Sequence, residues 1–129
     1  MAQQLPRATP RPERLTDVQL VSIDALHHRV EGAPTLDNAR QMRGLLDAAL
    51  AGLDGSADAP APQLTLELSL RGVTDGNSVL VSLMLVWMRR ARLAGVGIRF
   101  VEIPPLVMNL IEFTGLDDVL PMSPAGEAA

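Results

Sequence analysis

The stretch LTLELSLRGVTDGNSVLVSLMLVWM, residues 64–88, decides the fold of this chain. Its first part, residues 64–70, alternates leucine with Thr, Glu and Ser, which is the period-two pattern of a β-strand with one apolar face. Residues 71–77 are rich in Gly, Asp, Asn and Thr, as in a turn-forming loop. A helix is predicted from Ser78 to Ala94, where Gly95 ends it. The stretch therefore predicts a strand, a loop and a helix in succession.

Upstream of this stretch, two short strands are predicted at residues 18–23 and 26–30. A helix is then expected from Thr35, as its N-cap, to about Leu53. Apolar residues recur through it at helical spacing: Leu36, Ala39, Met42, Leu45, Leu46, Ala49, Leu50 and Leu53.

Downstream, residues 96–103 form another strand candidate, and Pro104-Pro105 opens a helix that Gly115 closes. Since strands and helices alternate, the chain is predicted to be an α/β protein with a mixed sheet of about four strands covered by helices. One domain is expected over residues 15–122. Polar tails are expected at residues 1–14 and 123–129, and a flexible loop, rich in Ala, Pro and Asp, at residues 54–63.

Composition excludes several classes of function. The chain has 129 residues, no cysteine and a formal net charge of −4 at pH 7, and all its basic residues are arginine apart from two histidines. Without cysteine there is neither a disulfide nor a thiolate metal site. Without lysine there is no phosphate-binding Gly-Lys-Ser/Thr loop. The acidic balance and the 2% of aromatic residues argue against nucleic-acid binding.

The remaining polar motifs give little support to an enzyme. His27 and His28 are interpreted as surface or packed residues of a strand, because no neighbouring residue completes a metal or catalytic site. Asp117-Asp118 is interpreted as a solvated turn. We therefore expect no catalytic residues, no metal site and no cofactor.

The helix from Ser78 has an unusual composition, because it is apolar all round for its first two and a half turns. Such a helix is buried on every side, either by its own domain or by a partner. We expect one stripe to pack on the sheet and Leu80, Leu83 and Trp87 to face a partner protein. Asn77 and Ser78 are expected to cap the helix and to lie at the rim of that interface. The longest apolar run, residues 79–88, is about half the ~20 residues that a membrane-spanning helix needs.

The segment Ser69–Val81 resembles the STAS domains (sulfate transporter and anti-sigma antagonist), whose motif is D-L-S-x-V-x-x-x-D-S/T-x-G-L between a strand and a helix. Ser78 falls on the Ser/Thr of that motif, which is phosphorylated in anti-sigma factor antagonists. Residues 30–39 are similar to the family's second strand and first helix, residues 106–116 to its last helix, and the whole resemblance covers residues 18–122. The ending Asp118–Pro121 resembles the small STAS subunit of Mla-type phospholipid ABC transporters.

Several positions depart from the family motif. Ser69 replaces the first Asp, Asn77 replaces the Asp before the phosphoacceptor, and Leu80 replaces a Gly. Because Asn77 has no carboxylate, the resemblance favours a cytoplasmic accessory subunit that binds and supports the ATPase of an Mla-type transporter maintaining outer-membrane lipid asymmetry. Such a subunit would reach the inner membrane only through its partner. The alternative is an anti-sigma factor antagonist controlled by phosphorylation of Ser78.

Overall fold

The computed structural model describes residues 18–53 and 64–122. The predicted tails at residues 1–14 and 123–129, and the loop predicted at 54–63, lie outside the described residues. Nothing in the structure tests those three predictions.

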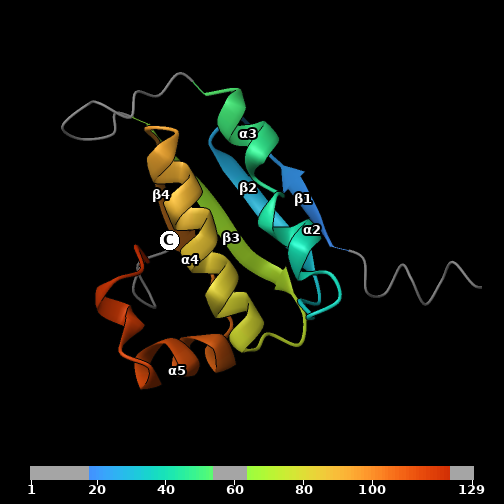
Figure 1. The fold of residues 1–129 in the computed structure, drawn as a ribbon, viewed down its shortest axis with the longest axis vertical. Helices are drawn as coiled ribbons and strands as arrows, with labels where there is room; N and C mark the ends of the chain where they lie inside the picture. Colours follow the sequence, from blue (N-terminus) through green and yellow to red (C-terminus); the bar gives the residue numbers. More distant parts are fainter. Residues whose placement is uncertain (1–17, 54–63, 123–129) are drawn as a thin grey trace, which may run out of the picture.

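The described chain forms a four-stranded mixed sheet in the order β1-β2-β3-β4 (Figure 1). The strands are β1 (Gln19–Ser22), β2 (His27–Gly32), β3 (Thr65–Val73) and β4 (Gly97–Val101). Strands β1 and β2 pair antiparallel as a hairpin, whereas β2, β3 and β4 run parallel to one another. The predicted α/β class and four-stranded sheet are confirmed.

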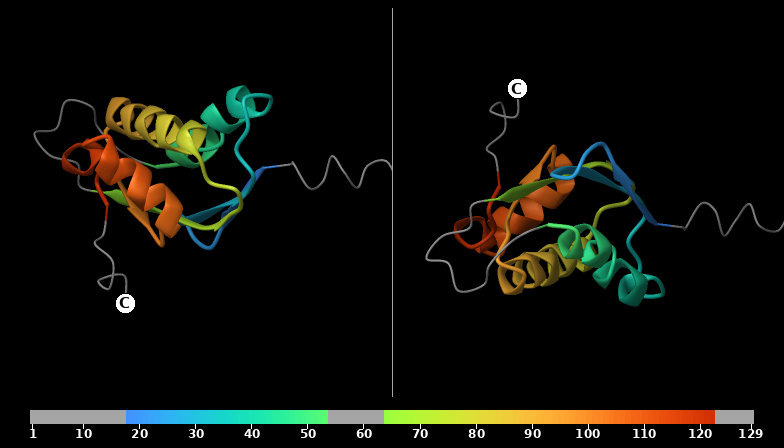
Figure 2. Two further views of the ribbon diagram at one scale, coloured as in Figure 1. Left: turned by 90° about the horizontal axis from the view of Figure 1, so that it is seen from below. Right: turned by 90° about the horizontal axis from the view of Figure 1, so that it is seen from above.

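The helices are α2 (Ala39–Arg43), α3 (Asp47–Ala51), α4 (Ser78–Leu93) and α5 (Pro105–Phe113), followed by a short 3₁₀ turn, η2 (Leu116–Asp118). Figure 2 shows that α2, α3 and α4 cover the same face of the sheet. Helix α5 lies beyond the end of the sheet at which β3 leads into α4 (Figure 1). It contacts α4. No described helix covers the opposite face of the sheet. Nor is any described helix long and apolar enough to cross a membrane.

The period-two pattern of β3 separates these two faces as predicted. Leu66, Leu68 and Leu70 are fully buried beneath the helices. Glu67, on the other face, pairs in register with His27 on one side and with Arg99 on the other. The open face is therefore polar, because alternate side chains of a strand point to opposite sides of the sheet.

The helix predicted from residue 35 to 53 is divided into two in the structure. Helix α2 ends at Arg43 and α3 starts at Asp47. Between them, Gly44 is the C-cap of α2, and its backbone N–H bonds back to the Gln41 carbonyl. Glycine is a poor residue for a helix interior, which explains the break. Thr35 is the first residue of a turn before α2, where it exchanges backbone-to-side-chain hydrogen bonds with Asn38 at 2.9 and 3.2 Å. Leu36 consequently lies before the helix and is 84% exposed, although its spacing predicted a place in the core.

Candidate functional site

Asn77 caps α4 and holds the loop that precedes it. Its Oδ1 accepts a hydrogen bond from the Val79 backbone N–H at 2.9 Å. Its Nδ2 donates to the Pro34 carbonyl at 3.1 Å and to the Asp75 carbonyl at 3.2 Å. The amide therefore ties the start of α4 to the segment before α2. An aspartate could cap the helix, but it could not donate these two bonds.

Ser78 is the first residue of α4 and is exposed. Capping, which the sequence assigned to both Asn77 and Ser78, is carried out by Asn77. The Ser78 hydroxyl instead stands at the surface beside the positive end of the helix dipole. That position suits a group that binds a partner or accepts a phosphate.

The expectation that Leu80, Leu83 and Trp87 face a partner is wrong. Their exposed fractions are 0%, 3% and 0%. The Trp87 indole N–H donates to the Met42 carbonyl at 2.8 Å, so helix α2 covers the side of α4 that the sheet leaves free. The sheet and helices α2 and α5 pack against α4 and bury these three side chains within the domain, whereas Val79, Leu85 and Met88 are only partly buried.

Two exposed leucines lie on segments that contact the loop before Ser78. Leu36 is two residues after Pro34, whose carbonyl is bound by Asn77. Leu106, which is 67% exposed, precedes Val107. Val107 packs against Gly76 so closely that a Cβ on that glycine would clash with its Cγ2. An exposed hydroxyl is thus flanked by two segments that each present an exposed leucine, and only the tertiary structure brings these segments together.

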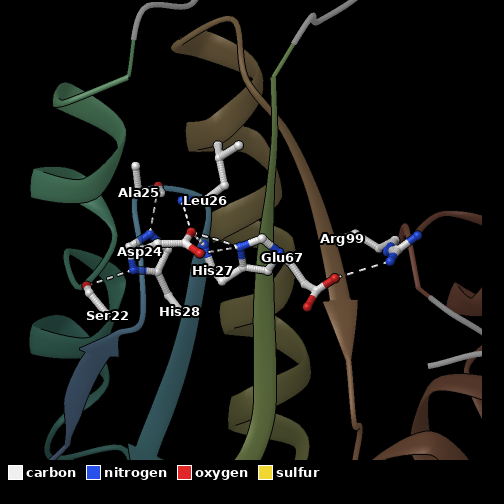
Figure 3. Close-up of polar contacts among 8 residues, drawn as sticks. All are labelled: Ser22, Asp24, Ala25, Leu26, His27, His28, Glu67 and Arg99. Atoms are coloured by element: carbon white, nitrogen blue, oxygen red, sulfur yellow. Dashed lines mark hydrogen bonds and ion pairs between the residues drawn. The ribbon is translucent and has the colours of Figure 1, made fainter. Parts of the chain in front are cut away.

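A second group of polar side chains lies around the β1–β2 hairpin (Figure 3). The Asp24 carboxylate accepts hydrogen bonds from the backbone N–H groups of Leu26 and His27 and contacts His27 Nδ1 at 2.8 Å. The carboxylate raises the pKa of His27, and the imidazole lowers the pKa of Asp24. On β3 and β4, Glu67 pairs with Arg99 at 3.2 Å.

His28 is buried and has a structural part in the hairpin. Its Nε2 lies 3.0 Å from the Ala25 carbonyl, so this nitrogen must carry the proton. Its Nδ1 lies within hydrogen-bond distance of the Ser22 hydroxyl, at 2.8 Å. Both histidines are thus surface or packed strand residues, as predicted, and no cluster of metal-binding side chains occurs within residues 18–53 and 64–122. Asp117 and Asp118 are exposed in η2, which agrees with a solvated turn.

Comparison with known proteins finds similarity among solved structures. No protein-family model and no curated protein sequence matches the chain. Among solved structures, the crystal structure of an anti-sigma factor antagonist from Mycobacterium paratuberculosis is similar, with a TM-score of 0.56 and 20% identity. The match covers 85% of this chain and 86% of that one. The mixed sheet, the helices on one face and this similarity together show that the chain has the STAS fold.

Proposed function

We propose that this chain is a non-catalytic regulatory protein of the anti-sigma factor antagonist kind, which binds a protein partner at the surface around Ser78. The observation that carries the proposal is the exposed serine hydroxyl at the start of α4, on a fold shared with an anti-sigma factor antagonist over most of both chains. Leu36 and Leu106 would contribute apolar contact beside the hydroxyl.

Phosphorylation of Ser78 would act on this surface in a simple way. A phosphate adds about −1.5 to −2 charges at pH 7. The N-terminus of α4 would stabilise that charge in the free protein. A partner that covers Leu36 and Leu106 would have to desolvate the charge, which is costly in an apolar contact. Phosphorylation would therefore favour the free protein over the complex.

Because Leu80, Leu83 and Trp87 are buried, they cannot form the partner interface on α4 that their sequence pattern predicted. One observation still favours the second candidate, an accessory subunit on the ATPase of an Mla-type phospholipid transporter. Asn77 lacks the carboxylate found in phosphorylated antagonists, and its amide is occupied in holding the loop. Under this candidate the same surface would bind the ATPase without phosphorylation, and the chain would be peripheral to the inner membrane through that partner.

A photo-crosslinking amino acid at position 78, introduced in the native host, separates the two candidates. The same amino acid at Thr65, which is exposed on the open face of the sheet, is the control position. A crosslink from position 78 to a kinase of the anti-sigma type, with a phosphate on Ser78 in the intact mass of the wild-type protein, supports the proposal. A crosslink to an ABC ATPase, with Ser78 unmodified, supports the second candidate. Equal crosslinking from both positions would refute a specific surface at Ser78.

A further inference from the structure

Helix α5 has two apolar sides, and the domain buries only one of them. Val107 and Ile111 are fully buried against the core. Leu106, Leu110 and Phe113 follow at spacings of four and three residues, which places them on one side of the helix. Their exposure rises from half-buried Leu110 to 67% at Leu106 and 89% at Phe113. These three residues are called the α5 stripe below.

The exposure of Phe113 is the most informative part of the α5 stripe. The chain has two phenylalanines, and the other, Phe100, is fully buried in the core. Val119, just beyond η2, is 52% exposed and adds to the apolar surface at this end of the domain. Several large apolar side chains exposed on one short helix mark an interaction surface more strongly than single exposed residues do.

The charges of this region indicate what the α5 stripe binds. Every charged residue between positions 102 and 122 is acidic: Glu102, Glu112, Asp117 and Asp118. All four are exposed, and Glu102 also accepts a hydrogen bond from Ser69 and lies 3.9 Å from Arg71. A second copy docked stripe to stripe would bring these carboxylates face to face, and an anionic membrane would repel them. A partner with apolar side chains and flanking basic groups matches both the apolar α5 stripe and the acidic residues around it.

We propose that the α5 stripe binds a basic amphipathic helix of a partner protein. The apolar face of such a helix would cover Leu106, Leu110 and Phe113. Its Lys or Arg side chains would lie beside Glu112 and Asp117. The inference goes beyond the function proposed for Ser78. The two surfaces share Leu106, but the α5 stripe uses neither the Ser78 hydroxyl nor its phosphorylation, and Phe113 belongs to the stripe alone.

Two designed helical peptides of about four turns test the proposal. Both carry leucines at helical spacing, and they differ only in having Lys or Glu on the flanking positions. Each is titrated into the full chain labelled with ¹⁵N, and binding is followed through the amide resonances. The lysine peptide should shift the resonances of α5 and η2 and saturate, with an affinity at least about tenfold higher than that of the glutamate peptide.

Phe113→Ala should weaken the lysine peptide about tenfold, as expected for an aromatic anchor. Leu93→Ala is the matched control, since this leucine is 72% exposed but lies at the other end of α4. It should leave the affinity unchanged. Glu112→Arg should weaken the lysine peptide and strengthen the glutamate peptide. Circular dichroism checks that each variant remains folded, which is expected because the altered side chains are exposed.

Several results would overturn the proposal. These are equal affinity for the two peptides, resonance shifts confined to other elements, and no effect of Phe113→Ala. Binding of the chain to vesicles containing phosphatidylglycerol that is lost in Phe113→Ala would assign the stripe to a lipid surface instead. A dimer in sedimentation that Phe113→Ala dissociates would assign it to a second copy.

Discussion

Replacing Trp87 by alanine tests the assignment of α4 to the core. The side chain is fully buried and its indole N–H donates to the Met42 carbonyl at 2.8 Å. Truncation of a buried Trp to Ala costs about 3–5 kcal/mol in lost burial and cavity formation. The Met42 carbonyl keeps its hydrogen bond from the Leu45 backbone N–H at 3.1 Å, so loss of the indole donor adds only about 0.5–1.5 kcal/mol. Since a domain is typically stable by only about 5–15 kcal/mol, Trp87→Ala should bring the chain close to unfolding.

Trp87→Phe gives an intermediate step if the alanine variant does not fold. It keeps an aromatic ring in the core but loses the N–H and part of the ring volume, so the free energy of unfolding should fall by roughly 1–3 kcal/mol. Leu93→Ala, at an exposed position of the same helix, should change stability by less than about 0.5 kcal/mol. Urea unfolding followed by far-UV circular dichroism is the assay, because Trp87 is the only tryptophan and its fluorescence is lost in both variants. If Trp87→Ala lowers the free energy of unfolding no more than Leu93→Ala does, Trp87 is not a core residue and its assignment to the core is wrong.

Three further predictions follow from local geometry. Gly72→Ala should lower the free energy of unfolding in urea by about 1–3 kcal/mol, because a Cβ there would lie 2.7 and 2.9 Å from atoms of β2. Gly52→Ala is the control and should be nearly neutral, because its Cβ would meet no atom closer than 3.7 Å. An NMR titration should give His27 a pKa above that of a free histidine, and Asp24→Asn should bring it down. The stabilisation from His27 is present below its unfolded-state pKa and is lost as pH rises through its folded-state pKa, and the stabilisation from Asp24 is lost as pH falls through the lowered pKa of that carboxylate. An unshifted His27 pKa would contradict the contact. Asn77→Ala should lower the free energy of unfolding by about 1 kcal/mol through loss of the helix cap, and an unchanged midpoint would contradict the capping role.

Local patterns in the sequence determined most of the secondary structure. The alternation of residues 64–70 predicted β3 and its buried face, and Pro104-Pro105 and Gly115 bracketed α5 within two residues. Such features depend on backbone geometry and on neighbours along the chain, so they are visible without the fold. The long helix from Ser78 was predicted within one residue of its end for the same reason.

The sequence also determined where Ser78 lies, because the resemblance to the STAS motif places it at the start of a helix after a strand. It could not determine which side of α4 is covered. Leu80, Leu83 and Trp87 were assigned to a partner because a helix on a sheet usually has one buried stripe. The burial of Trp87 depends on α2, which is more than 30 residues away in the chain and accepts the Trp87 hydrogen bond.

Only the tertiary structure decided which apolar residues remain at the surface. Periodicity placed Leu36 in the core, but it lies in a turn before α2 and is exposed. Leu106 and Phe113 have the same apolar character as Val107 and Ile111, and the two pairs differ only in the side of α5 that meets α4. Hydrophobic spacing shows that a residue can be buried, but whether it is buried depends on the element that packs against it.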